Sequence, residues 1–126
     1  MGLFSKKQKK VLIVDDEPLI LKMTSEFLGD AGFETVTASS TSEALTEIEK
    51  GGVDAMLLDI RLPDEDGLVF LPKFKKLHPE IPVVMLTGAG YDDTMMKEAL
   101  KLGAAGYVSK DTEMENMILA VKRVLK

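Results

Sequence analysis

The chain has 126 residues, a length that suits one compact domain with its own hydrophobic core. It contains no cysteine, which excludes disulfides and thiolate metal sites and fits a reducing compartment, so we expect a cytoplasmic location. The formal net charge of -5 argues against direct nucleic acid binding by this chain, and no apolar run approaches the length of a membrane span.

The first nine residues differ from the rest of the chain because they are rich in lysine. A secretory signal peptide would have an apolar stretch after its basic residues, and none follows here. We therefore interpret residues 1–9 as a solvated basic leader and residues 10–126 as a single domain.

Five short runs rich in apolar and β-branched residues predict strands, and the clearest is the uninterrupted run Val11 to Val14. Between them, apolar residues recur at the spacing of amphipathic helices. The predicted strands are 11–14, 33–38, 54–59, 82–86 and 106–109, and the predicted helices are 18–28, 41–50, 67–77, 94–102 and 113–125.

Helix starts are marked by proline and by two capping boxes. Pro18 suits a first helical position, with Glu17 or Asp16 as the cap of that helix. If Glu17 is not the cap, we interpret it as an acid at the rim of a site. Residues 40–43 and 112–115 both have a hydroxyl followed three positions later by glutamate, which predicts a capping box at each place.

Five repeats of strand then helix predict an α/β fold with a doubly wound, five-stranded parallel sheet in one domain. Polar groups at the strand ends favour the flavodoxin-like strand order 2-1-3-4-5. In that order the first and third strands are neighbours, so the side chains that follow them converge.

The polar groups at those ends are three acids, a hydroxyl and a lysine, namely Asp15, Asp16, Asp59, Thr87 and Lys110. Two carboxylates about 4 Å apart repel by roughly 4 kcal/mol at a surface-like dielectric, and a hard divalent cation offsets this. Mg²⁺ keeps open positions for phosphate oxygens, and an aspartate can accept a phosphoryl group as an acyl phosphate. The pattern therefore predicts a magnesium and phosphoryl-transfer site.

These motifs resemble those of the response-regulator receiver domain of two-component signalling, the chemotaxis-protein-like family. The resemblance covers about residues 10–126 and rests on the acid pair after the first strand, Asp59 after the third, and the loop motifs that follow. Those motifs are Leu62-Pro63, Asp66-Gly67, Thr87-Gly88 and Gly106 to Lys110.

The resemblance implies that Asp59 is the phosphorylated residue and that Mg²⁺ is the cofactor. Asp16 would bind the ion directly, Asp15 would bind it through water or complete the acidic pocket, and the backbone carbonyl of Arg61 would be a further ligand. The resemblance also implies that Thr87 and Lys110 contact the phosphoryl group.

The resemblance further implies a phosphorelay role rather than an enzyme with its own substrate. A histidine kinase or a histidine phosphotransfer protein would donate the phosphoryl group, and the domain would assist its own phosphorylation and dephosphorylation. Tyr107 would switch together with Thr87. The output face would be the fourth helix, fifth strand and fifth helix, acting on a downstream protein target or output domain. Phosphorylation-dependent dimerisation is left open.

Two rival functions and one departure from the family pattern remain. A magnesium-dependent aspartyl-phosphate phosphatase would want an acid two residues after the nucleophile, where Arg61 stands. A phosphate-independent receiver would usually lack one of the acids or the lysine.

The family commonly has proline after the lysine, but Asp111 follows Lys110 here, so we expect a trans peptide bond.

Overall fold

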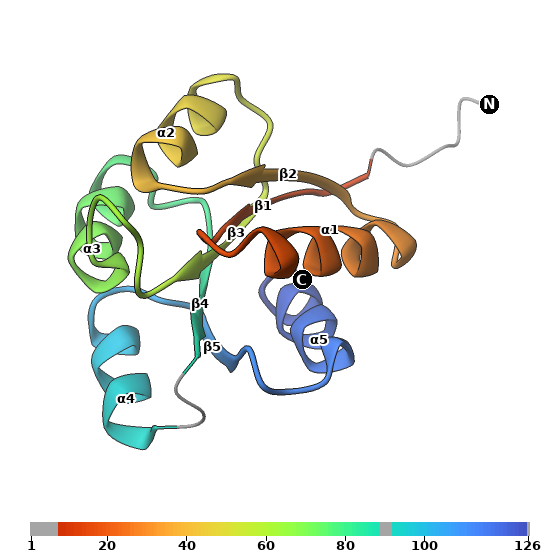
Figure 1. Ribbon diagram of the computed structural model, residues 1–126. Helices are drawn as coiled ribbons and strands as arrows, with labels where there is room; N and C mark the ends of the chain where they lie inside the picture. The colour runs from red at the N-terminus through yellow and green to blue at the C-terminus, as the bar shows by residue number, and fades with distance from the viewer. Residues whose placement is uncertain (1–7, 89–91, 126) are drawn as a thin grey trace.

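The computed structural model describes residues 8–88 and 92–125 (Figure 1). Most of the predicted basic leader lies outside the described residues, so the boundary near residue 10 stays a prediction. Within the described part of the chain, no helix is long and apolar enough to cross a membrane.

Strands and helices alternate along the chain as predicted, and the five strands are parallel in the order β2-β1-β3-β4-β5. The α/β fold and its flavodoxin-like strand order are thus confirmed. The strands are β1 (Lys10–Val14), β2 (Glu34–Ala38), β3 (Ala55–Asp59), β4 (Val83–Thr87) and β5 (Gly106–Ser109). The helices are α1 (Pro18–Asp30), α2 (Thr41–Glu49), α3 (Gly67–Leu77), α4 (Asp93–Lys101) and α5 (Met114–Val124).

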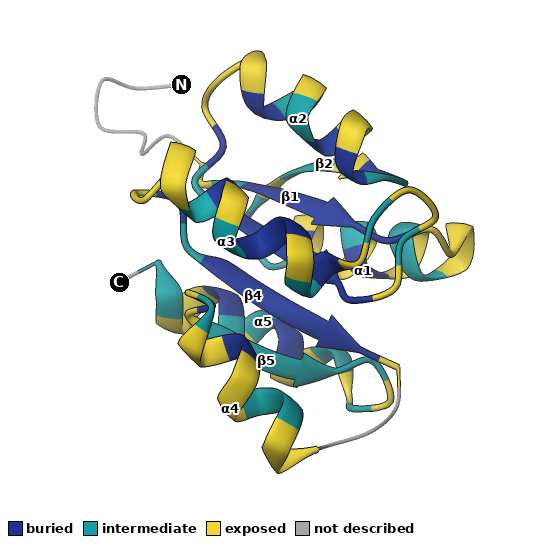
Figure 2. Ribbon diagram, turned by 90° about the vertical axis from the view of Figure 1, so that its left-hand side faces the viewer, coloured by how far each residue is buried: buried dark blue, intermediate teal, exposed yellow. Residues whose placement is uncertain are grey.

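The sheet lies between two helical layers, with α1 and α5 on one face and α2, α3 and α4 on the other (Figure 1). Alternate residues of β1 show why both faces are apolar. Leu12 and Val14 pack in the cluster under α2, α3 and α4, whereas Val11 and Ile13 pack in the cluster under α1 and α5. Figure 2 shows β4 buried along its length and β1 buried over most of it, while α2 and α3 carry both buried and exposed residues.

One capping box is confirmed and the other is wrong. Ser40 Oγ accepts a hydrogen bond from the backbone N–H of Glu43 at the start of α2. At the predicted second box, α5 begins at Met114 with Glu113 in the N-cap position and no side-chain cap. The Thr112 hydroxyl instead accepts a hydrogen bond from the Asn116 side-chain amide at 2.6 Å, so a competing local partner displaced the predicted cap.

Candidate functional site

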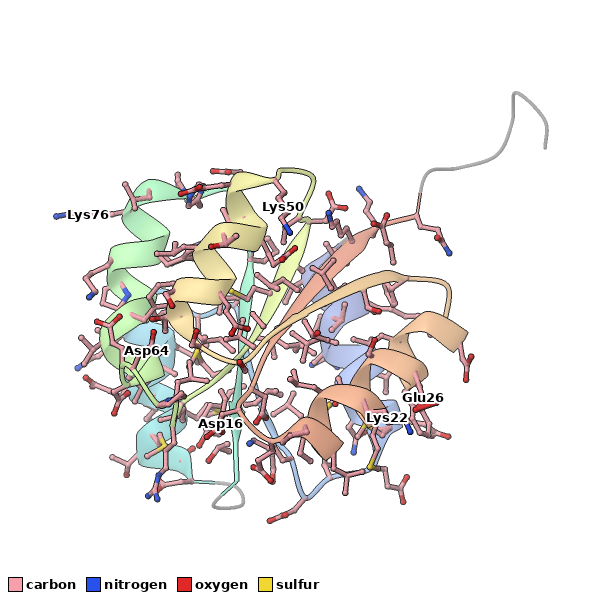
Figure 3. The ribbon with its side chains drawn as sticks, turned by 45° about the horizontal axis from the view of Figure 1, so that its top comes forward. Asp16, Lys22, Glu26, Lys50, Asp64 and Lys76 are labelled. Carbon is pink, nitrogen blue, oxygen red and sulfur yellow. The ribbon has the colours of Figure 1, made fainter. Side chains whose placement is uncertain are left out.

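The strand order brings the predicted site residues to one edge of the sheet. Asp15 follows β1, Asp59 ends the neighbouring β3, Thr87 ends β4, and Lys110 follows β5. Figure 3 shows Asp16 at this edge, in the loop between β1 and α1. Because all five strands run in parallel, their carboxyl ends place these side chains at the same edge of the sheet.

The three acids form a compact cluster. One carboxylate oxygen from each of Asp15, Asp16 and Asp59 lies within 4.8 Å of the others. Asp15 and Asp59 are buried, while Asp16 is exposed. Asp15 Oδ2 is a buried oxygen whose contact with Lys110 is an ion pair rather than a well-aligned hydrogen bond. The cluster offers only oxygen ligands, and Asp15 Oδ2 is a buried oxygen that accepts no well-formed hydrogen bond. Both features fit a hard divalent cation such as Mg²⁺.

Lys110 is the cation at the centre of this cluster. Its Nζ lies 2.8 Å from Asp15 Oδ2, 3.1 Å from Asp59 Oδ2 and 2.9 Å from Glu17 Oε1, and its side chain is 7% exposed. Burial acts to lower the pKa of Lys110, but the contacts with these carboxylates raise it above its ordinary value. The lysine is therefore charged at any physiological pH, and it partly neutralises the acids.

Asp59 lies in a setting that disfavours its charge. Burial and the neighbouring negative charge of Asp15 raise the pKa of Asp59 from 3.8 to about 6, although Lys110 acts in the opposite direction. A carboxylate whose charge is only partly compensated gains from a further cation. The electrostatics of the site therefore agree with the metal fit.

A pocket of about 570 Å³ opens at this edge, and Asp59 and Lys110 face it together with Thr87 and Arg61. Tyr107 is not among the residues that line it. Instead, Tyr107 is half-buried, stands opposite Met85 in the sheet, and packs against the core on the α3 and α4 side. The structure thus brings the predicted metal and phosphoryl residues together, whereas Tyr107 lies outside the lining of the pocket.

Sequence reasoning missed the partner of one acid, Glu17, and the place of one apolar residue, Met95, at the pocket. Glu17 occupies the N-cap position of α1 but makes no capping hydrogen bond, and its carboxylate contacts Lys110 instead. Met95, near the start of α4, also lines the pocket. A contact between residues 93 positions apart leaves no signal in local spacing, so the sequence left Glu17 open as a cap or as a rim acid and did not identify Lys110 as its partner.

The peptide bond between Lys110 and Asp111 is trans, as expected from the missing proline. The backbone N–H of Lys110 donates a 2.8 Å hydrogen bond to the carbonyl of Thr87. This bond ties the lysine to the end of β4, so two predicted phosphoryl-contacting residues are held side by side.

The loop between β3 and α3 is fixed by its own acid. Asp64, labelled in Figure 3, lies in this loop. It accepts hydrogen bonds from the Thr41 hydroxyl at 2.8 Å and from the backbone N–H groups of Thr41 and Ser42 at 3.1 Å. Burial acts to raise the pKa of Asp64, but these hydrogen bonds together hold that pKa below its ordinary value. The loop that carries Arg61 is thereby joined to the first turn of α2.

We expect Asp64→Ala to lower the free energy of unfolding by about 1–2 kcal/mol, because it removes a helix cap and leaves the buried Thr41 hydroxyl without that acceptor. Urea denaturation measures the change. Asp30→Ala, at the exposed end of α1, is the matched control and should cost nothing. Equal stability of the two variants would show that the Asp64 contacts do not hold the loop.

The chain matches known receiver domains over most of its length. The family model of the response regulator receiver domain matches residues 11–122. The nitrogen assimilation regulatory protein NtrX of Azorhizobium caulinodans is 36% identical over 118 residues, which cover 92% of this chain and 26% of that protein. The solved CheY-like receiver domain protein of Methanospirillum hungatei is 33% identical, with a TM-score of 0.86 and 94% of both chains covered. The solved receiver domain of NtrX from Brucella abortus is 37% identical, with a TM-score of 0.85, 91% of this chain covered and 97% of that one.

The chain spans only about a quarter of the NtrX relatives, so the match concerns their receiver part. The fold and strand order of this chain agree with the solved receiver domains. The chain therefore belongs to the response regulator receiver domain family of two-component systems.

Proposed function

We propose that this receiver domain is a Mg²⁺-dependent phosphoacceptor switch, and that Asp59 accepts the phosphoryl group. The single observation that carries the proposal is the juxtaposition of Asp59 with two further acids and a buried lysine around one open pocket. Phosphoryl transfer asks a protein mainly for positioning and charge neutralisation, and this arrangement supplies both.

Asp15, Asp16, Asp59 and the backbone carbonyl of Arg61 are the groups that would hold the ion. A bound Mg²⁺ supplies charge neutralisation for the carboxylates and for the phosphoryl oxygens. Because Asp15 and Asp59 are buried at the ends of neighbouring strands, their carboxylates need little rearrangement to bind.

This chain's own side chains accept the phosphoryl group and stabilise its charge. The bond from phosphorus to the donor atom breaks, a bond from phosphorus to a carboxylate oxygen of Asp59 forms, and the donor leaves with its electron pair. Lys110 and Thr87 stabilise the negative charge on the transferred group by charge-assisted and neutral hydrogen bonds. No side-chain base is needed, because the carboxylate attacks in its ionised form.

The donor is a histidine kinase or a histidine phosphotransfer protein, and the recipient of the signal is a downstream protein or output domain. The donor and the recipient are partners of the whole regulator to which this domain belongs. We place that regulator in the cytoplasm. The domain catalyses no turnover of a separate substrate, but it assists its own phosphorylation and dephosphorylation.

Switching would follow a population shift between two conformations that phosphorylation biases. Thr87 lines the pocket and pairs in the sheet with Ser109. Tyr107 lies two positions before Ser109 in β5, so a movement of Thr87 would be passed to Tyr107 through this strand. The face of α4, β5 and α5 carries exposed Leu100 and Leu119, which suit a protein contact. Dimerisation through this face would be one such contact.

The test is incubation with Mg²⁺ and acetyl phosphate followed by intact mass measurement. We expect a gain of one phosphoryl group, and no gain in Asp59→Asn or after removal of the metal with a chelator. A wild-type protein that gains no mass with any donor would favour the phosphate-independent binding module. Multiple turnovers of a phosphate ester would favour the phosphatase instead.

A further inference from the structure

Lys110 has an additional acid partner that the proposed chemistry does not use. Three carboxylates lie within 3.1 Å of its ammonium group, those of Asp15, Asp59 and Glu17. A lysine ammonium carries three N–H donors. Of the three contacts, only the one with Glu17 has the geometry of a hydrogen bond, so a phosphoryl oxygen that takes up this N–H donor competes with Glu17 for it.

The three partners differ in their freedom to leave. Asp15 is fully buried, and its Oδ1 accepts a 2.9 Å hydrogen bond from the backbone N–H of Glu17. Asp59 is itself the acceptor and ends a buried strand. The Glu17 side chain is 61% exposed, so it can turn into solvent without losing buried contacts.

Glu17 also makes the contact that orients the ammonium group. Its Oε1 accepts a well-formed hydrogen bond from Lys110 Nζ at 2.9 Å, whereas the contact with Asp15 is an ion pair of poorer alignment. The backbone N–H of Glu17 is bonded to Asp15, and Glu17 lines the same pocket as Asp59 and Lys110.

We propose that Glu17 is a positioning residue that holds Lys110 before phosphorylation and exchanges its place with a phosphoryl oxygen when Asp59 is modified. The proposal rests on Asp59 being the phosphoacceptor and names the side chain that sets how readily an anionic donor is used. With acetyl phosphate, the bond from phosphorus to the acetate oxygen breaks, a bond from phosphorus to Asp59 forms, and acetate leaves. Lys110 turns from Glu17 to the transferred group during this step.

Removing the Glu17 contact should therefore speed the reaction. An exposed ion pair of this kind is weak, so we expect Glu17→Gln to raise the rate constant for phosphorylation by acetyl phosphate about two- to fivefold. Glu17→Asp keeps the charge but is one methylene too short for the contact, so it should show most of the same gain. The thermal midpoint should stay unchanged in both variants, which separates this role from a structural one.

Glu26→Gln is the matched control, because it makes the same chemical change on an exposed acid further along α1 (Figure 3). Its rate should equal that of the wild type. All rates are measured by intact mass at Mg²⁺ concentrations that saturate each variant, so that a change in metal affinity does not enter.

The outcomes separate the two proposals. A modified wild type with a faster Glu17→Gln and a faster Glu17→Asp supports the exchange. A modified wild type with Glu17→Gln unchanged or slower, or with Glu17→Asp at the wild-type rate, overturns the role of Glu17 and leaves the phosphoacceptor function intact. No mass gain in any of these proteins overturns the phosphoacceptor function and the exchange together.

Discussion

Gly67→Ala should lower the free energy of unfolding by about 3 kcal/mol or more and displace the phosphoacceptor. A β-carbon at this position would overlap the backbone carbonyl oxygen of Asp59 and come within 3.1 Å of its carbonyl carbon and 3.0 Å of Ile60 Cα. Backbone atoms in the middle of a domain cannot yield cheaply, as a flexible side-chain end can. The backbone N–H of Gly67 also donates a 2.6 Å hydrogen bond to the carbonyl of Ile60, so the two segments must stay close.

Urea denaturation gives the change in stability, and intact mass after acetyl phosphate treatment reports whether Asp59 still reacts. Gly29→Ala is the control. Gly29 lies within α1, and a β-carbon added there would have no neighbouring atom within 4 Å, so alanine should stabilise the protein by about 0.5–1 kcal/mol. If Gly67→Ala unfolded at the wild-type denaturant concentration, the close approach of α3 to Asp59 would not exist in solution.

Asp59→Asn should stabilise the metal-free protein at neutral pH, in addition to abolishing phosphorylation. Burial and Asp15 raise the pKa of Asp59 to about 6, so the folded state holds the proton more tightly than the unfolded chain does. The stability gained from that proton is complete below the unfolded pKa, near 3.8, and is lost as the pH rises through about 6. At pH 7 the ionised carboxylate therefore opposes folding, and asparagine removes this penalty.

We expect Asp59→Asn to exceed the wild type by about 1–2 kcal/mol at pH 7, with the difference shrinking as the pH falls to about 4. A shift of about two pKa units corresponds to roughly 3 kcal/mol, and the open pocket and its solvent screening reduce that figure. Other titrating groups are common to both proteins, so the difference in unfolding free energy isolates Asp59.

Mg²⁺ supplies the second arm of this experiment. A bound cation neutralises the carboxylates of the wild type, so saturating Mg²⁺ should stabilise the wild type more than Asp59→Asn and reduce the gap at pH 7. A variant less stable than the wild type at pH 7 without metal, or a gap that does not depend on pH, would contradict the unfavourable environment assigned to Asp59.

Local patterns in the chain were enough for most of the architecture. The run Val11 to Val14 is apolar at every position because β1 is covered on both faces, and such a run indicates a central parallel strand. The alternation of strands and helices then allows only a few sheet topologies, because the crossover connections between parallel strands are almost always right-handed. Once the order of strands is known, Asp15, Asp59 and Lys110 must meet, since each follows or ends a strand at the same edge.

Contacts between distant segments were decided only by the tertiary structure. The sequence left Glu17 open as a helix cap or as an acid at the rim of a site, and the structure decides for the rim because Lys110 offers it a charged partner. Asp64 caps α2 from a loop 23 residues away, and Thr112 takes Asn116 as its partner instead of capping α5. Hydrophobic periodicity specifies which face of an element is buried. The choice among several polar partners depends on which of them the folded chain brings within about 3 Å, and that distance is set by packing rather than by local sequence.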